Sequence, residues 1–299
     1  MKTVILAGLD NLVFSAADLL NPKEYKLIGF GTPIEQAWNV YDANGEIKED
    51  IQEMPVMPVE AAVAWEPDRF ILAAGSREED EALRYILLRA NYQGEVFSLY
   101  DFFNGFSFRT AALRKLAWRL ESLGVQGALA DLGCYRGDIS WQLNALMPDR
   151  KLYLFDTFTG YDARDIAKER ELGLSEARPG EWSFSSRELE NFEQRILSRM
   201  PHEENVVVRA GWFPETALEL EDEHYALVYM DAGLYQPTVA GIQYFYPRME
   251  KGGVILIAGY EDGRTLSVRK AVADLEAQYG AFLMLPLCDL SGTVMIVKP

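Results

Sequence analysis

Residues 128–140 read ALADLGCYRGDIS, and this stretch decides the fold that we expect for the C-terminal part of the chain. Its apolar run at 128–132 is typical of a buried strand, and Gly133 and Gly137 follow that run closely. Apolar residues then recur at helical spacing, at Ile139, Leu143 and Leu146. A strand that turns through glycines into a helix lets the backbone approach a ligand closely, and the first turn of the helix offers free N–H groups to a carboxylate. The same pattern also fits a tight turn that binds nothing.

Strand-like runs continue at regular intervals to the C-terminal end. They cover residues 128–132, 151–155, 205–209, 226–230, 253–257, 282–286 and 293–297. We expect helices between the first six runs, because strands that alternate with helices become parallel strands joined by crossovers. Only the turn Asp289–Gly292 precedes the last run, and a crossover helix does not fit into it. The seventh strand is therefore predicted to run antiparallel to the sixth, as in a class I methyltransferase sheet.

The N-terminal part predicts a second, smaller α/β domain. Its strand-like runs are 3–8, 25–31, 69–74 and 95–99, its helical patterns are 11–20 and 78–91, and 40–54 is a candidate hairpin. We expect a Rossmann-like domain over residues 1–104 and a second domain over 105–299, entered by a helix that Gly124 caps. Only Gly8 remains of a G-x-G-x-x-G turn, and the charge of Asp10 would oppose a pyrophosphate. We therefore expect no NAD here, but a structural role, assembly of a homo-oligomer or placement of an acceptor.

A second polar site follows the next strand, where residues 154–160 read LFDTFTG. An acid at this strand end, Asp156, can accept hydrogen bonds from both ribose hydroxyls of an adenosine group. Together with the glycine turn, this acid fits S-adenosylmethionine better than NAD. The predicted cofactor-binding residues are Asp131, Gly133, Tyr135, Gly137, Ser140, Asp156, Thr157 and Phe158.

Composition limits the partners that we expect. The 29 basic and 46 acidic residues give a net charge of -17, which repels a nucleic-acid backbone. No apolar run approaches the length of a spanning helix and no cleavage-type ending follows the first residues, so we expect a cytoplasmic protein that does not enter a membrane. The 2 Cys and 2 His residues form neither a disulfide framework nor a zinc cluster.

At this point the sequence resembles the macrocin O-methyltransferase family, which methylates sugar hydroxyls, over about residues 107–299. The matching segments are Gly133–Gly137, Phe155–Gly160, Gly211–Thr216, Asp231–Tyr235, Tyr246–Gly253 and Val268–Val272. The resemblance implies a class I methyltransferase fold, S-adenosylmethionine as donor and a small-molecule acceptor such as a sugar. It also implies a segment over residues 160–185 that closes on donor and acceptor; the alternative is a surface helix at 163–171 and a loop.

The resemblance further implies a magnesium ion held by a carboxylate cluster, but the chain departs from that pattern. Asp231 matches the first ligand, whereas Gly233 stands at the second, and Ala258-Gly259 stand where the family has a pair of acids. The next acids, Glu261 and Asp262, come one or two residues too late. Because Mg²⁺ needs several oxygen ligands and gives up water reluctantly, we expect no magnesium site.

Three interpretations of Asp231 follow. It is a metal-free general base for the acceptor hydroxyl, a remnant in a catalytically inactive ligand-binding or scaffold protein, or a structural residue that caps the next loop. We favour an S-adenosylmethionine-dependent O-methyltransferase, with inactive binding as the alternative. The aromatic residues Trp182, Trp212, Tyr235 and Tyr260 are candidates for the lining of an acceptor pocket.

Overall fold

The computed structural model describes residues 1–8, 12–33, 50–51, 54–185, 189–261, 266–289 and 291–299. The chain divides into two compact units, Met1–Ser107 and Phe108–Pro299. Asp10 and most of the candidate hairpin at 40–54 lie outside the described residues. No described helix is long and apolar enough to cross a membrane.

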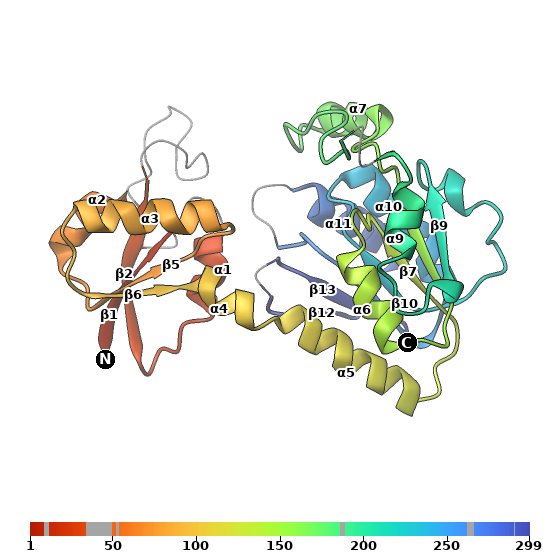
Figure 1. Cartoon of the computed structure of the whole chain (residues 1–299), viewed down its shortest axis with the longest axis horizontal. Helices are drawn as coiled ribbons and strands as arrows, with labels where there is room; N and C mark the ends of the chain where they lie inside the picture. The colour runs from red at the N-terminus through yellow and green to blue at the C-terminus, as the bar shows by residue number, and fades with distance from the viewer. Residues whose placement is uncertain (9–11, 34–49, 52–53, 186–188, 262–265, 290) are drawn as a thin grey trace. The chain divides into compact units, whose positions relative to one another are not determined.

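The first unit is built on a six-stranded sheet with helices on both faces (Figure 1). Its strands are β1 (Lys2–Ala7), β2 (Tyr25–Thr32), β3 (Asp50–Ile51), β4 (Met54–Pro58), β5 (Arg69–Leu72) and β6 (Glu95–Ser98), in the spatial order β3-β4-β2-β1-β5-β6. All pairs are parallel except β3 with β4. The helices are α1 (Leu12–Asp18), α2 (Val59–Ala62), α3 (Arg77–Arg89) and α4 (Leu99–Gly105), with a 3₁₀ turn at Val63–Trp65.

The central strand of this unit explains its layered arrangement. Val4, Ile5, Leu6 and Ala7 are all fully buried, so β1 is apolar on both faces, as a parallel strand between two helical layers must be. One face packs against α1 and the other against α2 and α3. Ser76 caps α3, because its hydroxyl accepts from the Glu79 N–H while the Glu79 carboxylate accepts from the Ser76 N–H. The unit therefore has the Rossmann-like architecture that its sequence predicts.

The second unit holds a seven-stranded sheet. Its strands are β7 (Ala128–Leu132), β8 (Leu152–Asp156), β9 (Val206–Ala210), β10 (Tyr225–Met230), β11 (Met249–Ile257), β12 (Met284–Pro286) and β13 (Val294–Val297). The order is β12-β13-β11-β10-β7-β8-β9, and β13 runs antiparallel to both β11 and β12. This confirms the predicted class I methyltransferase sheet with an antiparallel last strand.

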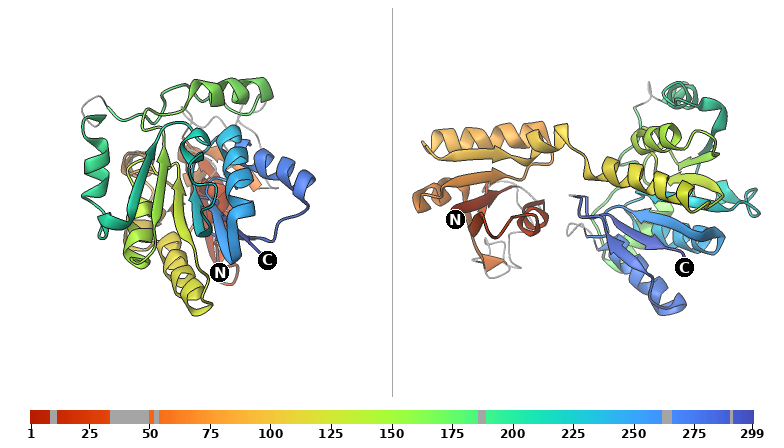
Figure 2. Two further views of the ribbon diagram at one scale, coloured as in Figure 1. Left: turned by 90° about the vertical axis from the view of Figure 1, so that its right-hand side faces the viewer. Right: turned by 90° about the horizontal axis from the view of Figure 1, so that it is seen from below.

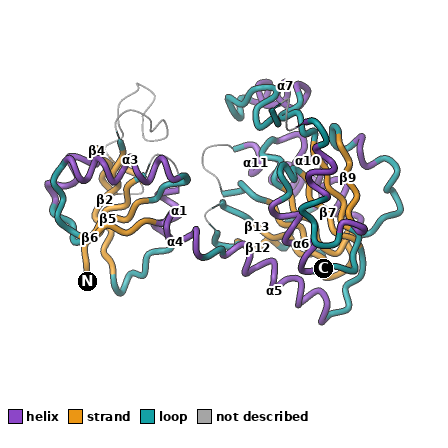
Figure 3. The backbone as a smooth tube through the Cα atoms, viewed as in Figure 1, coloured by secondary structure: helices purple, strands orange, loops and turns teal. Residues whose placement is uncertain are grey.

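Helices cover both faces of this sheet (Figures 2 and 3). They are α5 (Phe108–Ser122), α6 (Asp138–Leu146), α7 (Ala163–Leu172), α9 (Phe192–Leu197), α10 (Tyr235–Arg248) and α11 (Ser267–Tyr279), with 3₁₀ turns at Glu203–Asn205 and Glu215–Ala217. Residues of α5, α6 and α9 pack on one face, and residues of α10 and α11 pack on the other. Gly124 ends α5 with a left-handed φ of 66°, which confirms its predicted role as a C-terminal cap.

One predicted helix is wrong. Between β9 and β10 the fully described residues 211–224 contain only the 3₁₀ turn Glu215–Ala217. Pro214 lacks an N–H donor and disfavours helical backbone at the residue before it, and it lies near the start of this short connection. The connection therefore crosses without an α-helix.

The strand ends on which the site is built are tied together by backbone hydrogen bonds. Gly133 N donates to Phe155 O at 2.8 Å, and Asp231 N donates to Leu132 O at 2.8 Å. Gly211 N donates to Asp156 O, and Ala258 N donates to Met230 O, each at 2.9 Å. These bonds extend the parallel ladder one residue beyond the strands, so the residues after β7, β9, β10 and β11 lie in a row with the end of β8 among them.

Gly133 provides a test of this close packing. It has a φ of 83°, and a Cβ atom built on it would lie 2.6 Å from the Asp231 carbonyl oxygen. We expect Gly133→Ala to lower the free energy of unfolding by about 2–4 kcal/mol, because strain and a backbone clash add. Gly124→Ala is the matched control, since its φ is 66° but no atom lies within 4 Å of its Cβ position. It should cost only about 1–2 kcal/mol. Equal losses in urea unfolding of the two variants would contradict the close approach.

Candidate functional site

The loop after β7 follows a backbone path that few sequences allow. Gly133, Tyr135 and Gly137 have left-handed φ values of 83°, 47° and 78°. Gly137 is the N-cap of α6, and its N–H donates to Cys134 O at 2.7 Å. The loop therefore turns sharply at the strand end, with α6 beginning directly behind it.

Asp131 and Ser140 form a buried pair beneath this loop. Asp131 is 1% exposed and Ser140 is fully buried, and the Ser140 hydroxyl donates to Asp131 Oδ2 at 2.5 Å. Burial raises the pKa of Asp131 to about 7; the Ser140 hydrogen bond opposes the rise, and the charges of Asp231 and Asp156 add to it. Asp131 is thus an acid whose charge depends on what binds nearby.

Asp156, at the end of β8, braces the loop. Its Oδ2 accepts from Tyr135 N at 2.8 Å, and its Oδ1 accepts from Phe158 N at 2.7 Å. Burial raises its pKa, and these backbone N–H groups oppose the rise. The sequence predicts that this acid binds ribose. In the structure its carboxylate already accepts hydrogen bonds from two backbone N–H groups. Each carboxylate oxygen has a second lone pair, so ribose hydroxyls still fit.

Two neighbours predicted to bind a cofactor have internal partners instead. The Thr157 hydroxyl donates to Gly160 O at 2.6 Å. Phe158 is 2% exposed, and its ring lies 4.5 Å from Phe192 and 5.8 Å from Phe184, measured between centroids. These contacts place Phe158 in the core, so its side chain anchors the loop to the hydrophobic interior.

Asp231 lies directly after β10 and is accessible to solvent. The protein around its carboxyl nevertheless raises its pKa, while the Arg109 guanidinium lowers it and the charge of Asp289 raises it further. An accessible carboxylate with so much protein around it suits contact with a small molecule. No hydrogen bond to its side chain is formed within the described part of the chain, which leaves the loop-capping interpretation without support.

The positions that the family resemblance gives to further metal ligands do not fit a metal ion. At Gly233, where φ is 68°, a Cβ atom would lie 2.9 Å from the Tyr161 hydroxyl oxygen. Ala258 is buried and Gly259 has no side chain. Glu261 is exposed, and Asp262 lies outside the described residues. Among the residues that the structure describes, no group of three or more His, Cys, Asp or Glu side chains could hold a metal ion.

The four aromatic candidates for an acceptor pocket each contact a different polar or aromatic partner. Trp212 Nε1 donates to both Asp165 oxygens at 3.1 Å, under the Arg164 guanidinium. The Tyr235 hydroxyl donates to Asp274, and Tyr260 lies under Arg269. Trp182 is 63% exposed, and its ring lies edge-on to Tyr135 at 6.4 Å between centroids.

The segment over residues 160–185 is fixed by a carboxylate that sequence reasoning missed. Glu169 of α7 is fully buried. Its Oε1 accepts from Tyr235 N at 2.6 Å, and its Oε2 accepts from the hydroxyls of Ser267 at 2.6 Å and Ser175 at 2.7 Å. The first turns of α10 and α11 therefore hold α7, and the surface-helix interpretation is wrong for this face. No local pattern signals these contacts, because Ser267 lies 98 residues from Glu169.

Three acids at adjacent strand ends give the site its chemical character. Asp131, Asp156 and Asp231 belong to the ends of β7, β8 and β10, and the charges of the last two both raise the pKa of the first. Like charges held together attract a cation. S-adenosylmethionine carries a positive sulfonium, so this donor set fits it, and the open lone pairs of Asp156 fit its ribose.

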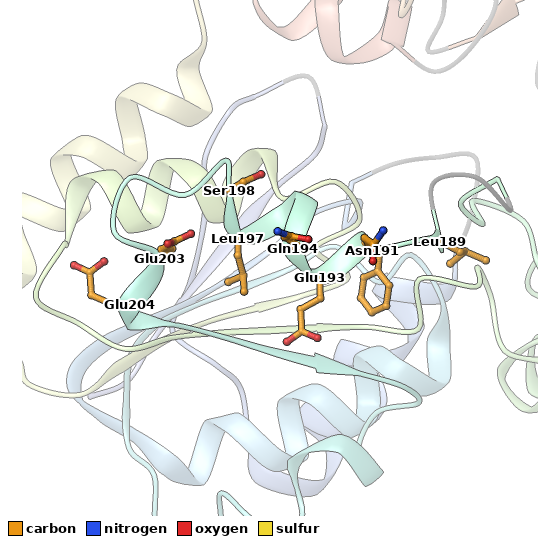
Figure 4. A pocket seen from close by; sticks show the side chains of 9 residues that line it. Leu189, Asn191, Glu193, Gln194, Leu197, Ser198, Glu203 and Glu204 are labelled. Carbon is orange, nitrogen blue, oxygen red and sulfur yellow. The ribbon is translucent and has the colours of Figure 1, made fainter.

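A separate depression of about 840 Å³ lies along α9 (Figure 4). It is lined by Leu189, Asn191, Phe192, Glu193, Gln194, Leu197, Ser198, Glu203 and Glu204. It contains none of the strand-end acids, and we assign no chemistry to it.

Comparison with known proteins agrees with this geometry. The family model of Macrocin-O-methyltransferase (TylF) matches residues 107–294. The 8-demethyl-8-(2,3-dimethoxy-alpha-L-rhamnosyl)-tetracenomycin-C 4'-O-methyltransferase of Streptomyces olivaceus is 27% identical over 179 residues, which are 57% of this chain and 65% of that relative. The chain thus spans slightly less than two thirds of that relative's length.

A solved methyltransferase structure shares the fold at low identity. The calicheamicin methyltransferase CalS11 superposes with a TM-score of 0.50 at 16% identity, covering 75% of this chain and 87% of its own. The O-methyltransferase NovP gives a TM-score of 0.49 at 20% identity, covering 64% and 79%. The family match includes the glycine loop and the ends of β7, β8 and β10. The chain therefore belongs to the macrocin O-methyltransferase family.

Proposed function

We propose that this protein is an S-adenosylmethionine-dependent O-methyltransferase that acts on a hydroxyl group of a sugar-containing small molecule. The observation that carries the proposal is the row of acids Asp131, Asp156 and Asp231 at adjacent strand ends, beside the glycine loop of a family member. The name of the Streptomyces olivaceus relative supports a sugar acceptor, because that enzyme methylates a 4'-oxygen of a rhamnosyl compound.

The glycine loop, the start of α6 and the acids Asp156 and Asp231 each have a role in this proposal. The loop at Gly133–Gly137 and the N-terminus of α6 receive the methionine carboxylate, and Asp156 accepts from the ribose hydroxyls. When bound, S-adenosylmethionine supplies an electrophilic methyl group on a sulfonium. Asp231 takes the proton of the acceptor hydroxyl as the oxygen–methyl bond forms and the sulfur–methyl bond breaks, with that electron pair remaining on sulfur. Alignment of the donor methyl group with the acceptor oxygen provides most of the remaining rate enhancement.

The alternative is a family member that binds the donor without turnover. Gly233 and Ala258 favour this alternative. They stand where the family resemblance implies metal ligands, and the mechanism that it implies depends on that metal ion. In both cases we propose that the site works without magnesium, and that residues 1–104 bind no NAD and serve assembly or acceptor placement.

The first prediction concerns ribose recognition. Asp156→Asn and Asp156→Ala should weaken S-adenosylhomocysteine binding by about 1–3 kcal/mol, the alanine variant more, because charge-assisted hydrogen bonds are lost. Asp149→Asn is the control, since Asp149 is an exposed acid that precedes β8, at the opposite end of that strand from Asp156. Titration calorimetry measures the affinities, and thermal unfolding checks the loop that Asp156 braces. Unchanged affinity in a folded Asp156→Ala protein would remove the assignment.

The second prediction uses the raised pKa of Asp131, which is about 7. As the pH rises from about 6 to about 7.5, Asp131 ionises and its charge attracts the sulfonium, so S-adenosylmethionine should bind on the order of three- to tenfold more tightly. S-adenosylhomocysteine has a neutral sulfur and should change less. Asp131→Asn keeps an acceptor for Ser140 and should remove most of the pH dependence. The same pH dependence in Asp131→Asn as in the unmodified protein would refute this role.

The third prediction separates the enzyme from the inactive binder. Methyl transfer from labelled S-adenosylmethionine is measured on a panel of rhamnosylated and other glycosylated small molecules. An active protein should keep its turnover in a chelator and lose about 10²- to 10⁴-fold in Asp231→Asn, with donor affinity retained. Donor binding without any transfer across the panel would favour the inactive alternative. Turnover that requires added magnesium would overturn the metal-free site.

A further inference from the structure

Arg109 is a cation inside the second unit that the proposed function does not use. It is the second residue of α5, and its side chain is 20% exposed. The guanidinium lies over the ring of Tyr229 at 5.7 Å from the centroid, and its Nε donates to Asp289 Oδ2 at 3.0 Å. It therefore lies between the end of β10 and the turn that joins β12 to β13.

The partner of Arg109 is itself fixed. The Asp289 side chain is 7% exposed, its Oδ1 accepts from Thr293 N at 2.9 Å, and its Oδ2 accepts from the Thr293 hydroxyl at 2.8 Å. The fully engaged carboxylate holds the guanidinium in one place. Burial of an ion pair costs free energy unless further hydrogen bonds stabilise it. The hydrogen bonds from Thr293 therefore indicate that the location of this pair is specific.

The charge of the guanidinium acts on Asp231. Tyr229, whose ring the guanidinium covers, lies near the end of β10, and Asp231 is the first residue after that strand. A charge above the Tyr229 ring therefore acts on the Asp231 carboxylate, and Arg109 is the cation that lowers the pKa of Asp231 against the effect of the surrounding protein.

The position that the family resemblance gives to a second ligand is also occupied by the chain itself. The Tyr161 hydroxyl fills the space in which a side chain at position 233 would begin. Tyr161 is held in the backbone by Gly180 N, which donates to its O at 2.9 Å, and by Glu181 O, which accepts from its N at 3.0 Å. An acid at position 233 would have to displace this hydroxyl and tolerate a φ of 68°.

We propose that the Arg109 guanidinium is the resident cation of the Asp231 site. It replaces the divalent metal ion that the family resemblance implies at this site. The inference rests on the proposed function, because it assigns Arg109 the positioning of the acceptor. A fixed guanidinium favours the ionised form of Asp231, which proton removal requires, and offers N–H donors to the oxygens of a neutral polyol. It fits hydroxyl groups of a sugar and needs no metal.

Removal of the resident cation leaves the interacting charges of Asp231 and Asp289 without the guanidinium that offsets both, and this makes the idea testable. Binding of Mn²⁺ alone is measured by electron paramagnetic resonance on the purified full chain. Arg109→Ala should gain one Mn²⁺ site at least about tenfold tighter than any binding by the unmodified protein. Arg109→Ala combined with Asp231→Asn should lose that gain. Arg109→Lys, which keeps a positive charge, should not acquire it.

Arg150→Ala is the matched control, because Arg150 is a partly buried arginine that donates to the carbonyl oxygens of Gly127 and Val125 at the opposite strand ends. It should gain no Mn²⁺ site. The inference is overturned if the unmodified protein binds one Mn²⁺ that Asp231→Asn removes, or if folded Arg109→Ala gains none. Arg109→Gln replaces the alanine variant if that variant does not fold. S-adenosylhomocysteine titration of the same samples tests the proposed function separately, since the Mn²⁺ result requires no donor.

Discussion

The site depends on one constraint: the ends of parallel strands stay in register beyond the last residue of the sheet. Gly133 N to Phe155 O and Asp231 N to Leu132 O are backbone bonds, so side chains do not set the spacing of these positions. A backbone ladder brings acids from distant parts of the chain to neighbouring places at one edge. Their repulsion is then a property of the fold, and it persists because the sheet cannot relax to separate them.

Electrostatics follows from this enforced proximity. Asp131 has no cationic partner within hydrogen-bond distance in the described chain, and only the Ser140 hydroxyl and the backbone oppose the effect of its burial. Asp231 differs, because the surrounding protein raises its pKa while the charge of Arg109 lowers it. The same edge therefore holds one acid that titrates near neutral pH and another whose ionised form a cation favours. That division suits one region that receives a positive ligand and one that removes a proton.

Much of this could be predicted from the sequence, and the remainder could not for identifiable reasons. Apolar runs and the short turn at Asp289–Gly292 were sufficient for the sheet and its antiparallel strand, because both depend on local pattern and chain length. The alternation of strands and helices predicted a helix before β10 that does not form, although Pro214 is a local signal against it. Arg109 was beyond reach, since its partner lies 180 residues away and neither residue belongs to a motif. The partners of Trp212 and Tyr235 could not be predicted either, because each lies on another element.

The buried Glu169 has a consequence for the movement of ligands. Swinging α7 outward would break the bonds from Tyr235 N, Ser267 and Ser175 together and leave a carboxylate without partners. An event of that kind belongs to local unfolding, on microseconds or longer, and not to the nanosecond motion of a surface loop. Any ligand that passed beneath α7 would enter and leave through a rare opening, so its exchange with solvent would be slow.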